Sequence, residues 1–365
     1  MPLDQPSPAA SGLEGVVAAE TVLSMVDGEA GILVMRGHSL AEIVGRHGFE
    51  WLIGELWRGF VDRDLDEAAL SRDLGTARVA AFEALRPLFP AARALSPMAA
   101  LRLFVASVPD EAPEMELRLV ATVAVGLAAA VRLRVGGEPL APDRTAAHAA
   151  DLLRMVTGAS APAAHAPALE TYLVSAMEHG LNASTFTARV VASTRAGLPA
   201  AVTAALCALT GPLHGGAPGP VLDMLDAIGP PENAERWLDA ALDRGDRLMG
   251  FGHRVYRVRD PRSDVVKCVV ATLSPDAGRL RYAEAVEAAA LAILARRKPG
   301  RSLQTNLEFY TALLLEALGI PREAFTGIFA AARVVGWIAH AHEQVRSSRI
   351  IRPQSHYVGP VPVSG

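Results

Sequence analysis

The interpretation of this chain starts from LTGPLHGGAPGPVLDMLDAIG at residues 209–229 and DRLMGFGHRVYRVRDPRSDVVK at residues 246–267. Each stretch holds one histidine in a glycine-rich turn, His214 in the first and His253 in the second, and an arginine-rich run follows His253. Glycine beside histidine lets a small ligand approach the imidazole closely, because no Cβ stands in the way. Either histidine alone is compatible with an ordinary loop residue. Together, the two turns and the guanidinium groups predict a site for a small anion.

The size and composition of the chain predict a large folded protein and argue against several other classes. The sequence has 365 residues, of which 51% are hydrophobic and 20% are charged, and its net charge is −4. That length predicts two domains, and the composition supplies a large buried core. A negative net charge without a basic block argues against a nucleic-acid partner. Cys207 and Cys268 lie in apolar stretches without metal-type spacing, so we expect buried thiols in a reducing compartment.

The termini and apolar runs predict a soluble, cytoplasmic protein with no membrane contact. The first residues are rich in Pro, Ser and Ala and lack the basic start of a signal peptide, so we expect a loose tail at residues 1–12. The longest apolar run, residues 119–131, is too short to cross a bilayer and predicts a buried core helix.

The pattern of short and long periodicities predicts a mainly α fold with a small N-terminal β-hairpin. Residues 13–38 carry short β-branched runs around a turn at Asp27-Gly28, which is typical of a hairpin. Ser39 and Glu42 then form a capping-box signature that opens a helix. From there on nearly every segment has helical spacing, punctuated by Pro and Gly, and no fixed-period repeat is visible.

Two loop-rich stretches predict where the domains join. The run GGAPGP at residues 215–220 and the run at residues 296–305 interrupt the helical pattern. We therefore expect a large helical domain, residues 13–215 plus 325–365, and a small domain, residues 216–324, inserted between its two halves. A ligand cleft is expected between the two domains, where binding pockets are common.

Few residues are left to carry chemistry. The sequence contains no Walker loop, dinucleotide fingerprint, HExxH motif or CxxC pair. The remaining candidates for a site are three histidines, one acid and a set of arginines; the histidines and the acid are His179, His214, His253 and Glu308. Asn306 is a plausible N-cap, so Glu308 falls in a first helical turn, where a carboxylate could equally serve only to complement the helix dipole. The three histidines lack the spacing of zinc ligands on one helix face, which disfavours a zinc hydrolase.

Several motifs together resemble the citrate synthase family. They are EHGLNASTFTARVVAST, GPLHGGA, MGFGHRVYRVRDPR, LEALGIPREAFTGIFAAARVVGWIAH and RIIRP, and the resemblance runs from about Gly12 to Pro360. It is strongest to the short bacterial type, which includes 2-methylcitrate synthases. The resemblance implies a mostly helical homodimer whose domains close on oxaloacetate. It also implies condensation of an acyl-CoA with that keto acid and hydrolysis of the thioester, with the CoA thioester as substrate and no metal or redox cofactor.

The family motifs assign roles to the three histidines. By resemblance, His214 hydrogen-bonds the thioester oxygen of the enolate, and a neutral imidazole suits that task. His253 polarises the ketone of oxaloacetate and protonates the new alkoxide, and His179 hydrogen-bonds the same keto acid.

The family motifs also assign the anion-binding residues. Oxaloacetate carries two carboxylates, which planar guanidinium groups pair bidentately. The positions that match are Arg262, Arg333 and Arg352, and the last is expected to reach into the site of the partner subunit. Without the motif, Arg333 would be interpreted as a helix-surface residue.

Contacts to CoA are expected from three basic residues. Arg257, which we place one helical turn past His253, matches a CoA-binding arginine of the family. Lys298 and Arg301 lie in a loop that often carries further basic residues, although a solvated basic loop explains them equally well.

The main departure from the family pattern is Glu308. The family has an aspartate there as the base that removes a proton from acetyl-CoA, whereas this chain reads NLEFYTA. Glutamate adds roughly 1.3 Å of reach, and a misplacement near 1 Å can cost about 100-fold in rate. Three functions therefore stay open: a working citrate synthase, a relative that uses propionyl-CoA or another acyl-CoA or keto acid, and a weakly active or inactive paralogue that acts as a binding partner.

Overall fold

The computed structural model describes five stretches of the chain, which are residues 11–13, 15–216, 218–273, 278–347 and 349–360. Most of the tail expected at residues 1–12 lies outside them, and Ser11–Leu13 form a short 3-10 helix. Within the described residues the fold is mainly helical with one small sheet, as the sequence predicts. The α-helices are α1 Leu40–Ile43, α2 Phe49–Trp57, α3 Glu67–Leu85, α4 Phe89–Ala92, α5 Pro97–Ala106, α6 Met115–Arg134, α7 His148–Thr157, α8 His165–Ala176, α9 Ala183–Ser193, α10 Leu198–Leu209, α11 Pro218–Ile228, α12 Ala234–Asp243, α13 Pro261–Leu273, α14 Gly278–Arg297, α15 Leu307–Ala317 and α16 Phe325–Ser347.

The expected hairpin is present and belongs to a three-stranded antiparallel sheet. Strands β1 (Ser24–Asp27) and β2 (Ile32–Met35) pair with Ser24 opposite Met35, and β3 (His38–Ser39) adds a short third strand. The Asp27 carboxylate closes the turn by accepting hydrogen bonds from the backbone N–H groups of Glu29 and Ala30.

Short polar side chains begin several helices where local sequence predicts them. The Ser39–Glu42 capping box opens α1. The Asn182 side chain accepts a hydrogen bond from the Thr185 N–H at the start of α9, and Asn306 does the same for Glu308 at the start of α15. These caps matter for function because they set where the loops before α9 and α15 end.

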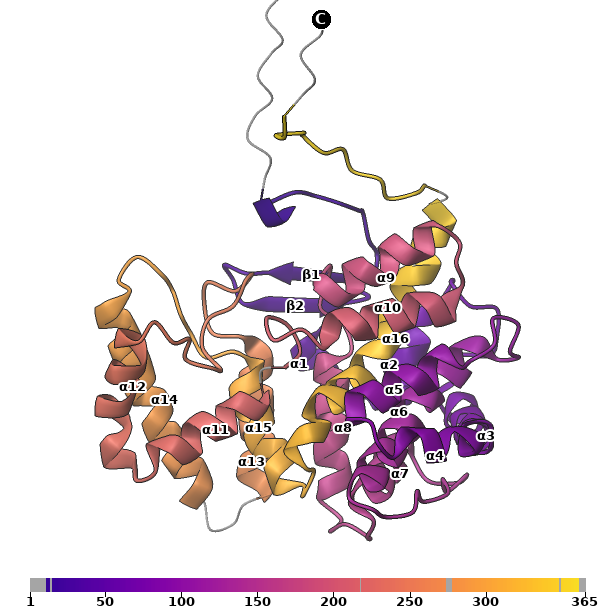
Figure 1. Cartoon of the computed structure of the whole chain (residues 1–365), viewed down its shortest axis with the longest axis horizontal. Helices are drawn as coiled ribbons and strands as arrows, with labels where there is room; N and C mark the ends of the chain where they lie inside the picture. The colour runs from indigo at the N-terminus through magenta and orange to yellow at the C-terminus, as the bar shows by residue number, and fades with distance from the viewer. Residues whose placement is uncertain (1–10, 14, 217, 274–277, 348, 361–365) are drawn as a thin grey trace, which may run out of the picture.

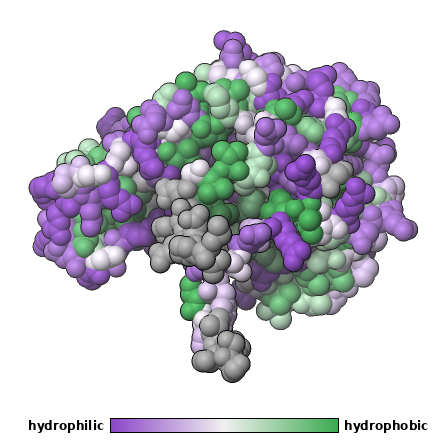
Figure 2. All heavy atoms as spheres, turned by 90° about the horizontal axis from the view of Figure 1, so that it is seen from above, coloured by the Kyte–Doolittle hydropathy of each residue, from purple (hydrophilic) through white to green (hydrophobic). Residues whose placement is uncertain are grey.

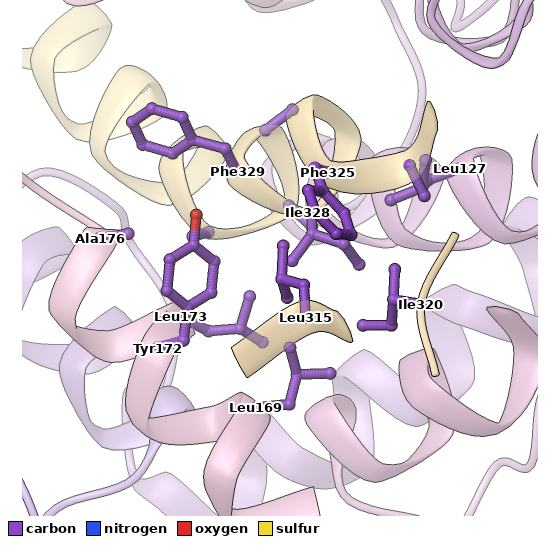
Figure 3. Packing of buried hydrophobic residues seen from close by; sticks show 14 of the residues in the cluster. Leu127, Leu169, Tyr172, Leu173, Ala176, Leu315, Ile320, Phe325, Ile328 and Phe329 are labelled. Carbon is purple, nitrogen blue, oxygen red and sulfur yellow. The ribbon is translucent and has the colours of Figure 1, made fainter. Parts of the chain in front are cut away.

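Helices α6 and α16 form the centre of the larger helical mass (Figure 1). Residues 119–131 of α6 are buried throughout, which confirms the predicted core helix. Figure 3 shows apolar side chains of α8, α15 and α16 meeting in one cluster, with Leu169, Leu315 and Ile328 among them. This packing places α8 against both α15 and α16.

Figure 1 shows a second, smaller helical mass, containing α11, α12 and α14, beside the larger one. Helices α13 and α15 lie between the two, and α13 contacts both α15 and α8. Figure 2 shows the same two masses from above, with apolar residues gathered near the middle of this face.

The prediction of buried cysteines is wrong for this chain. Cys207 on α10 and Cys268 on α13 are both exposed and both free. Both residues sit in amphipathic helices, and an apolar neighbourhood in sequence does not say which face of a helix a residue occupies.

One described segment, Arg322–Ser347, is long and apolar enough to cross a membrane by length and composition. Its most apolar window is 94% buried inside the protein, as expected of a core helix.

Candidate active site

His179 lies in the break between α8 and α9, where Glu178 fixes the backbone. The buried Glu178 Oε1 accepts hydrogen bonds from the Gly180 N–H at 2.6 Å and the Ser24 hydroxyl at 2.9 Å, and it lies 3.0 Å from His340 Nε2. A Cβ at Gly336 of α16 would lie 2.6 Å from Glu178 Oε2, so glycine is what lets the turn approach α16. His179 is thereby held rigidly against the core.

The loop that follows Gly252 brings His253 to His179. The two imidazole ring centroids are 5.3 Å apart, and His179 Nε2 lies 3.1 Å from the hydroxyl of the buried Tyr256. Burial, reinforced by the positive charge of Arg262, lowers the pKa of His179 well below its ordinary value. Both histidines therefore face the same small space, and His179 is neutral there.

Hydrogen bonds define which nitrogen of His253 carries the proton. Its Nδ1 accepts the backbone N–H groups of Val255 at 3.0 Å and Tyr256 at 3.1 Å. Burial, with Arg262 as the next cause, lowers the pKa of His253 to about 4. A neutral ring with Nδ1 as acceptor must carry its proton on Nε2, so His253 presents an Nε2–H donor.

His214 has the opposite arrangement. Its Nε2 accepts the Ser184 backbone N–H at 3.3 Å, and the Ser184 hydroxyl lies 2.8 Å from the same atom. That hydroxyl itself donates to the Asn182 side chain and accepts from Trp337 Nε1. Burial lowers the pKa of His214 to about 4, with Arg333 adding to the effect. The neutral ring therefore offers Nδ1–H as its donor.

Arg262, at the start of α13, is buried and held by Asp260. Asp260 Oδ1 accepts from Arg262 Nε at 3.0 Å, and Oδ2 accepts from Nη2 at 2.7 Å and from the Leu307 backbone N–H at 3.2 Å. This carboxylate ties the loop after His253 to the start of α15. The Arg262 guanidinium is oriented before any ligand arrives.

Arg333 is buried within α16, whereas its sequence taken alone suggested a surface position. Its Nε donates to the Ala176 carbonyl at 2.7 Å, and its guanidinium lies 4.9 Å from the centre of the Phe329 ring. Burial lowers the pKa of Arg333 to about 10, and Glu178 and Arg262 are among the charges that act on it. Two guanidinium groups, Arg262 and Arg333, therefore stand near each other in the core and favour an anion between them.

Glu308 places a carboxyl group among these side chains. It stands in the first turn of α15, and its Oε2 is buried without a hydrogen-bond partner among the described residues. Burial raises its pKa to about 7; Arg262 and Arg333 lower the value and Asp260 raises it. A buried acid with a pKa near neutrality and an unpartnered oxygen can exchange a proton with a ligand.

Short backbone pairings keep the His253 loop beside Glu308. The Gly252 N–H donates to the Gln304 carbonyl at 2.7 Å, and the Asn306 N–H donates to the Gly250 carbonyl at 2.9 Å. Gly250 has φ +87°, a conformation that favours glycine, and a Cβ there would lie 2.8 Å from Phe309 Cβ. The glycines of the motif thus allow two loops to approach each other closely. The sequence alone does not reveal this role.

The basic residues expected to bind CoA lie on two adjoining exposed loops. Arg257 is not one helical turn from His253, because residues 252–260 are irregular; Pro261 begins the next helix. The Ser302 hydroxyl donates to the Arg257 carbonyl, which joins this loop to the one that carries Lys298 and Arg301.

Arg352 stands apart from this cluster. It is exposed, on the segment that follows α16 and runs away from the helical body (Figure 1). Within this single chain, the structure brings together His179, His214, His253, Arg262, Arg333 and Glu308, and leaves Arg352 outside.

Comparison with known proteins identifies the family. The family model described as "Citrate synthase, C-terminal domain" matches residues 12–354. The citrate synthase of Haloferax volcanii is 37% identical, with 95% of each chain covered. This chain belongs to the citrate synthase family. A 2-methylcitrate synthase of Mycobacterium tuberculosis is 33% identical, with 95% of this chain and 90% of the relative covered.

Solved citrate synthases share the fold over nearly the whole chain. The enzyme of Thermotoga maritima superposes with a TM-score of 0.86 at 34% identity, covering 97% of each chain. A Thermoplasma acidophilum citrate synthase, solved as a ternary complex with carboxymethyl coenzyme A and oxaloacetate, superposes with a TM-score of 0.87 at 25% identity and 98% coverage of each chain. The protein is thus a citrate synthase-type acyltransferase.

Sequence reasoning missed several residues of this candidate site. Asp260, Ser184 and Tyr256 hold the assigned arginine and histidines; they lie within the quoted motifs, but they were assigned no role from the sequence. Tyr172 on α8 was also missed: its hydroxyl is buried, and Figure 3 shows it directed toward α16. Charge from Glu308, Arg333 and Arg262 acts on the Tyr172 hydroxyl, whose pKa is raised mainly by burial.

A metal-binding cluster is not evident in the part of the chain that the structure describes. No group of three His, Cys, Asp or Glu side chains there could hold an ion.

Proposed function

We propose that this chain condenses acetyl-CoA with oxaloacetate and hydrolyses the citryl thioester to citrate and CoA. One observation carries the proposal most strongly. A buried carboxyl group with a pKa near 7 stands in the same site as two neutral histidines, which present opposite ring nitrogens as donors. Condensation needs one base and two hydrogen-bond donors, since an enolate forms first and an alkoxide second.

The first step assigns Glu308 and His214. The carboxylate of Glu308 removes a proton from the methyl group of the acyl-CoA, and the electron pair moves onto the thioester oxygen. The Nδ1–H of His214 donates a hydrogen bond to that oxygen. Because the ring is neutral, it stabilises the enolate without giving up its proton. Glu308 would thus replace the aspartate that the family uses as base.

The second step assigns His253 and His179. The enolate carbon attacks the ketone carbon of oxaloacetate, a C–C bond forms, and the carbonyl electron pair becomes an alkoxide. His253 polarises the ketone through Nε2–H and then transfers that proton to the alkoxide, and the proton that Glu308 took from the methyl group restores the neutral ring. His179 hydrogen-bonds the same keto acid beside it. Water then cleaves the thioester and releases CoA.

The arginines bind the two carboxylates of the keto acid. Arg262 and Arg333 bind from within the chain, where their buried guanidinium groups have been oriented by Asp260 and the Ala176 carbonyl. Arg352 completes the set from the partner subunit of a homodimer. Its exposed position on an extended terminal segment is consistent with that reach, as are the apolar residues gathered near the middle of the face that Figure 2 views.

CoA binds along the exposed basic loops, and the two domains close around both substrates. Arg257, Lys298 and Arg301 face the CoA phosphates. The large domain, residues 13–215 plus 325–365, forms the dimer, and the small domain, residues 216–324, moves against it. The enzyme acts in the cytoplasm, without a metal or redox cofactor.

A 2-methylcitrate synthase activity is the second candidate. One argument for it is the relative of that name. The other is the longer reach of Glu308 beside Thr311 and Ala312, because these residues together change the shape of the turn that meets the acyl group.

Release of free thiol from either acyl-CoA separates the candidates. The protein is mixed with oxaloacetate and acetyl-CoA or propionyl-CoA, with donor-only mixtures as controls. A higher kcat/KM with acetyl-CoA supports the citrate synthase, and a higher value with propionyl-CoA supports the second candidate. No thiol from either donor, with oxaloacetate still bound, would refute both and leave a binding paralogue.

A further inference from the structure

The β1–β2 hairpin touches both loops that carry the facing histidines. On one side, the Ser24 hydroxyl donates to Glu178 Oε1 at 2.9 Å and accepts the Gly180 N–H at 3.0 Å, so it bonds to the residues on both sides of His179. On the other side, the Gly28 carbonyl accepts the Arg257 N–H at 2.8 Å. Ser24 and Gly28 are only four residues apart. Together they link the loop of His179 to the loop of His253, about 80 residues later in the sequence.

Glycine is required where the turn meets the second loop. A Cβ on Gly28 would stand far inside the van der Waals radius of the Val255 carbonyl. A Cβ on Gly31 would lie 2.8 Å from Val258 Cγ2, and Gly31 has φ +68°. The turn therefore lies against the backbone of the loop, and not merely near its side chains.

The base of the hairpin is fixed to the helical body. Leu23, Leu33 and Met35 are buried in the main core. The Arg36 guanidinium donates from Nε to the Glu55 carbonyl at 3.0 Å and from Nη2 to the Arg58 carbonyl at 3.1 Å. The base of the hairpin is thus anchored in the helical body. Its turn can therefore hold the second loop in place.

We propose that this hairpin is a positioning bridge, which sets the loop of His253 and Arg257 at the distance from His179 that a single keto acid requires. Ser24 and Gly28 are its positioning residues, and neither touches a substrate. The inference rests on the proposed function, since it takes His179 and His253 as ligands of one keto acid.

The bridge acts on His253 through the backbone. Val255, which Gly28 contacts, donates its N–H to His253 Nδ1 at 3.0 Å. Moving Val255 therefore turns the imidazole ring that must face the ketone, and it shifts Arg257 as well. Displacement of a reacting group by about 1 Å can cost on the order of 100-fold in rate.

Gly28→Ala and Ser24→Ala test the bridge, with Glu29→Ala as the matched control because its side chain is exposed in the same turn. We expect Gly28→Ala to lower kcat/KM for oxaloacetate at least about tenfold. We also expect faster amide hydrogen exchange over residues 253–259 of the unliganded protein, at a nearly unchanged melting temperature. Ser24→Ala should lower kcat/KM less, and Glu29→Ala should match the wild type.

Wild-type kcat and KM values in Gly28→Ala would overturn the bridge. If that variant does not fold, wild-type constants in Ser24→Ala would overturn it instead. If the unmodified protein condenses neither acyl-CoA with oxaloacetate, the proposed function fails by itself. Hydrogen exchange then tests the bridge alone, and unchanged protection of residues 253–259 in Gly28→Ala would refute it.

Discussion

Glu308 differs from the other site residues because its Oε2 atom has no hydrogen-bond partner among the described residues. His214, His253, Arg262 and Arg333 each contact a fixed protein group, whereas Glu308 Oε2 is buried and unpaired. An unpaired buried oxygen is costly unless a ligand uses it. This is the physical reason to regard glutamate here as a working base and not as a helix-dipole residue alone.

The raised pKa of Glu308 predicts the pH dependence of turnover. A base works only when deprotonated, and burial raises the pKa of this carboxyl to about 7. His214 and His253, with pKa values near 4, do not change charge in that range. We expect kcat/KM for the acyl-CoA to rise with pH through about 7, tenfold per pH unit on the acid side. A flat profile from pH 5.5 to 8 would contradict the assignment.

The same shift predicts a stability effect. The folded-state pKa lies above the unfolded value of 4.5, so stability falls as pH rises from 4.5 to about 7 and stays lower above it. The full penalty of burying the charge is about 3 kcal/mol. We therefore expect Glu308→Gln to unfold at a higher denaturant concentration than the wild type at pH 8, with little difference at pH 4.5. Equal unfolding midpoints of the two proteins at pH 8 would show that burial of the Glu308 carboxylate does not lower the free energy of unfolding.

At the scale of elements, Asp260 joins α13 to the start of α15. Asp260→Asn would leave the buried Arg262 charge poorly paired, which commonly costs about 3–5 kcal/mol. We expect lower stability in denaturant unfolding and a raised KM for oxaloacetate. Asp264→Asn is the control, since Asp264 is exposed and pairs with the partly exposed Arg259. Equal effects of the two variants would contradict the role given to Asp260.

Elements whose cause is local could be predicted from the sequence. The hairpin turn at Asp27, the capping box at Ser39 and the N-cap at Asn306 depend on residues within a few positions, and all three are present. The core helix at residues 119–131 could be predicted as well, because its apolar run has no polar face.

Features that depend on distant contacts could not be predicted. Arg333 is buried because α8 packs against it, and Cys207 is exposed because of how α10 packs. Arg257 was wrongly placed in a helix, since the glycines around His253 serve loop pairing with residues 304–306. Ser24 and Glu178 meet across 154 positions, which no local pattern indicates. Family resemblance supplied the candidate roles of the histidines and arginines, but not the hydrogen bonds that set their tautomers.

At the scale of the whole molecule, the proposed dimer is part of the site. Arg352 lies outside the cluster within one chain, so its proposed role requires a second chain. An Arg352→Ala subunit and a His253→Ala subunit should each be inactive alone. Coexpression should restore about a quarter of wild-type activity, because half of randomly paired dimers are mixed and each mixed dimer has one intact site. Unrestored activity, with mixed dimers present, would show that Arg352 serves its own subunit.

The most direct test of the account is CoA release from acetyl-CoA and oxaloacetate by the wild type and by Glu308→Ala, with oxaloacetate affinity measured on the same samples. We predict turnover by the wild type and a loss of at least about 1,000-fold in the variant. The dissociation constant for oxaloacetate should change little, because the histidines and arginines that bind it are intact. Wild-type turnover in Glu308→Ala would contradict the central claim that Glu308 is the base.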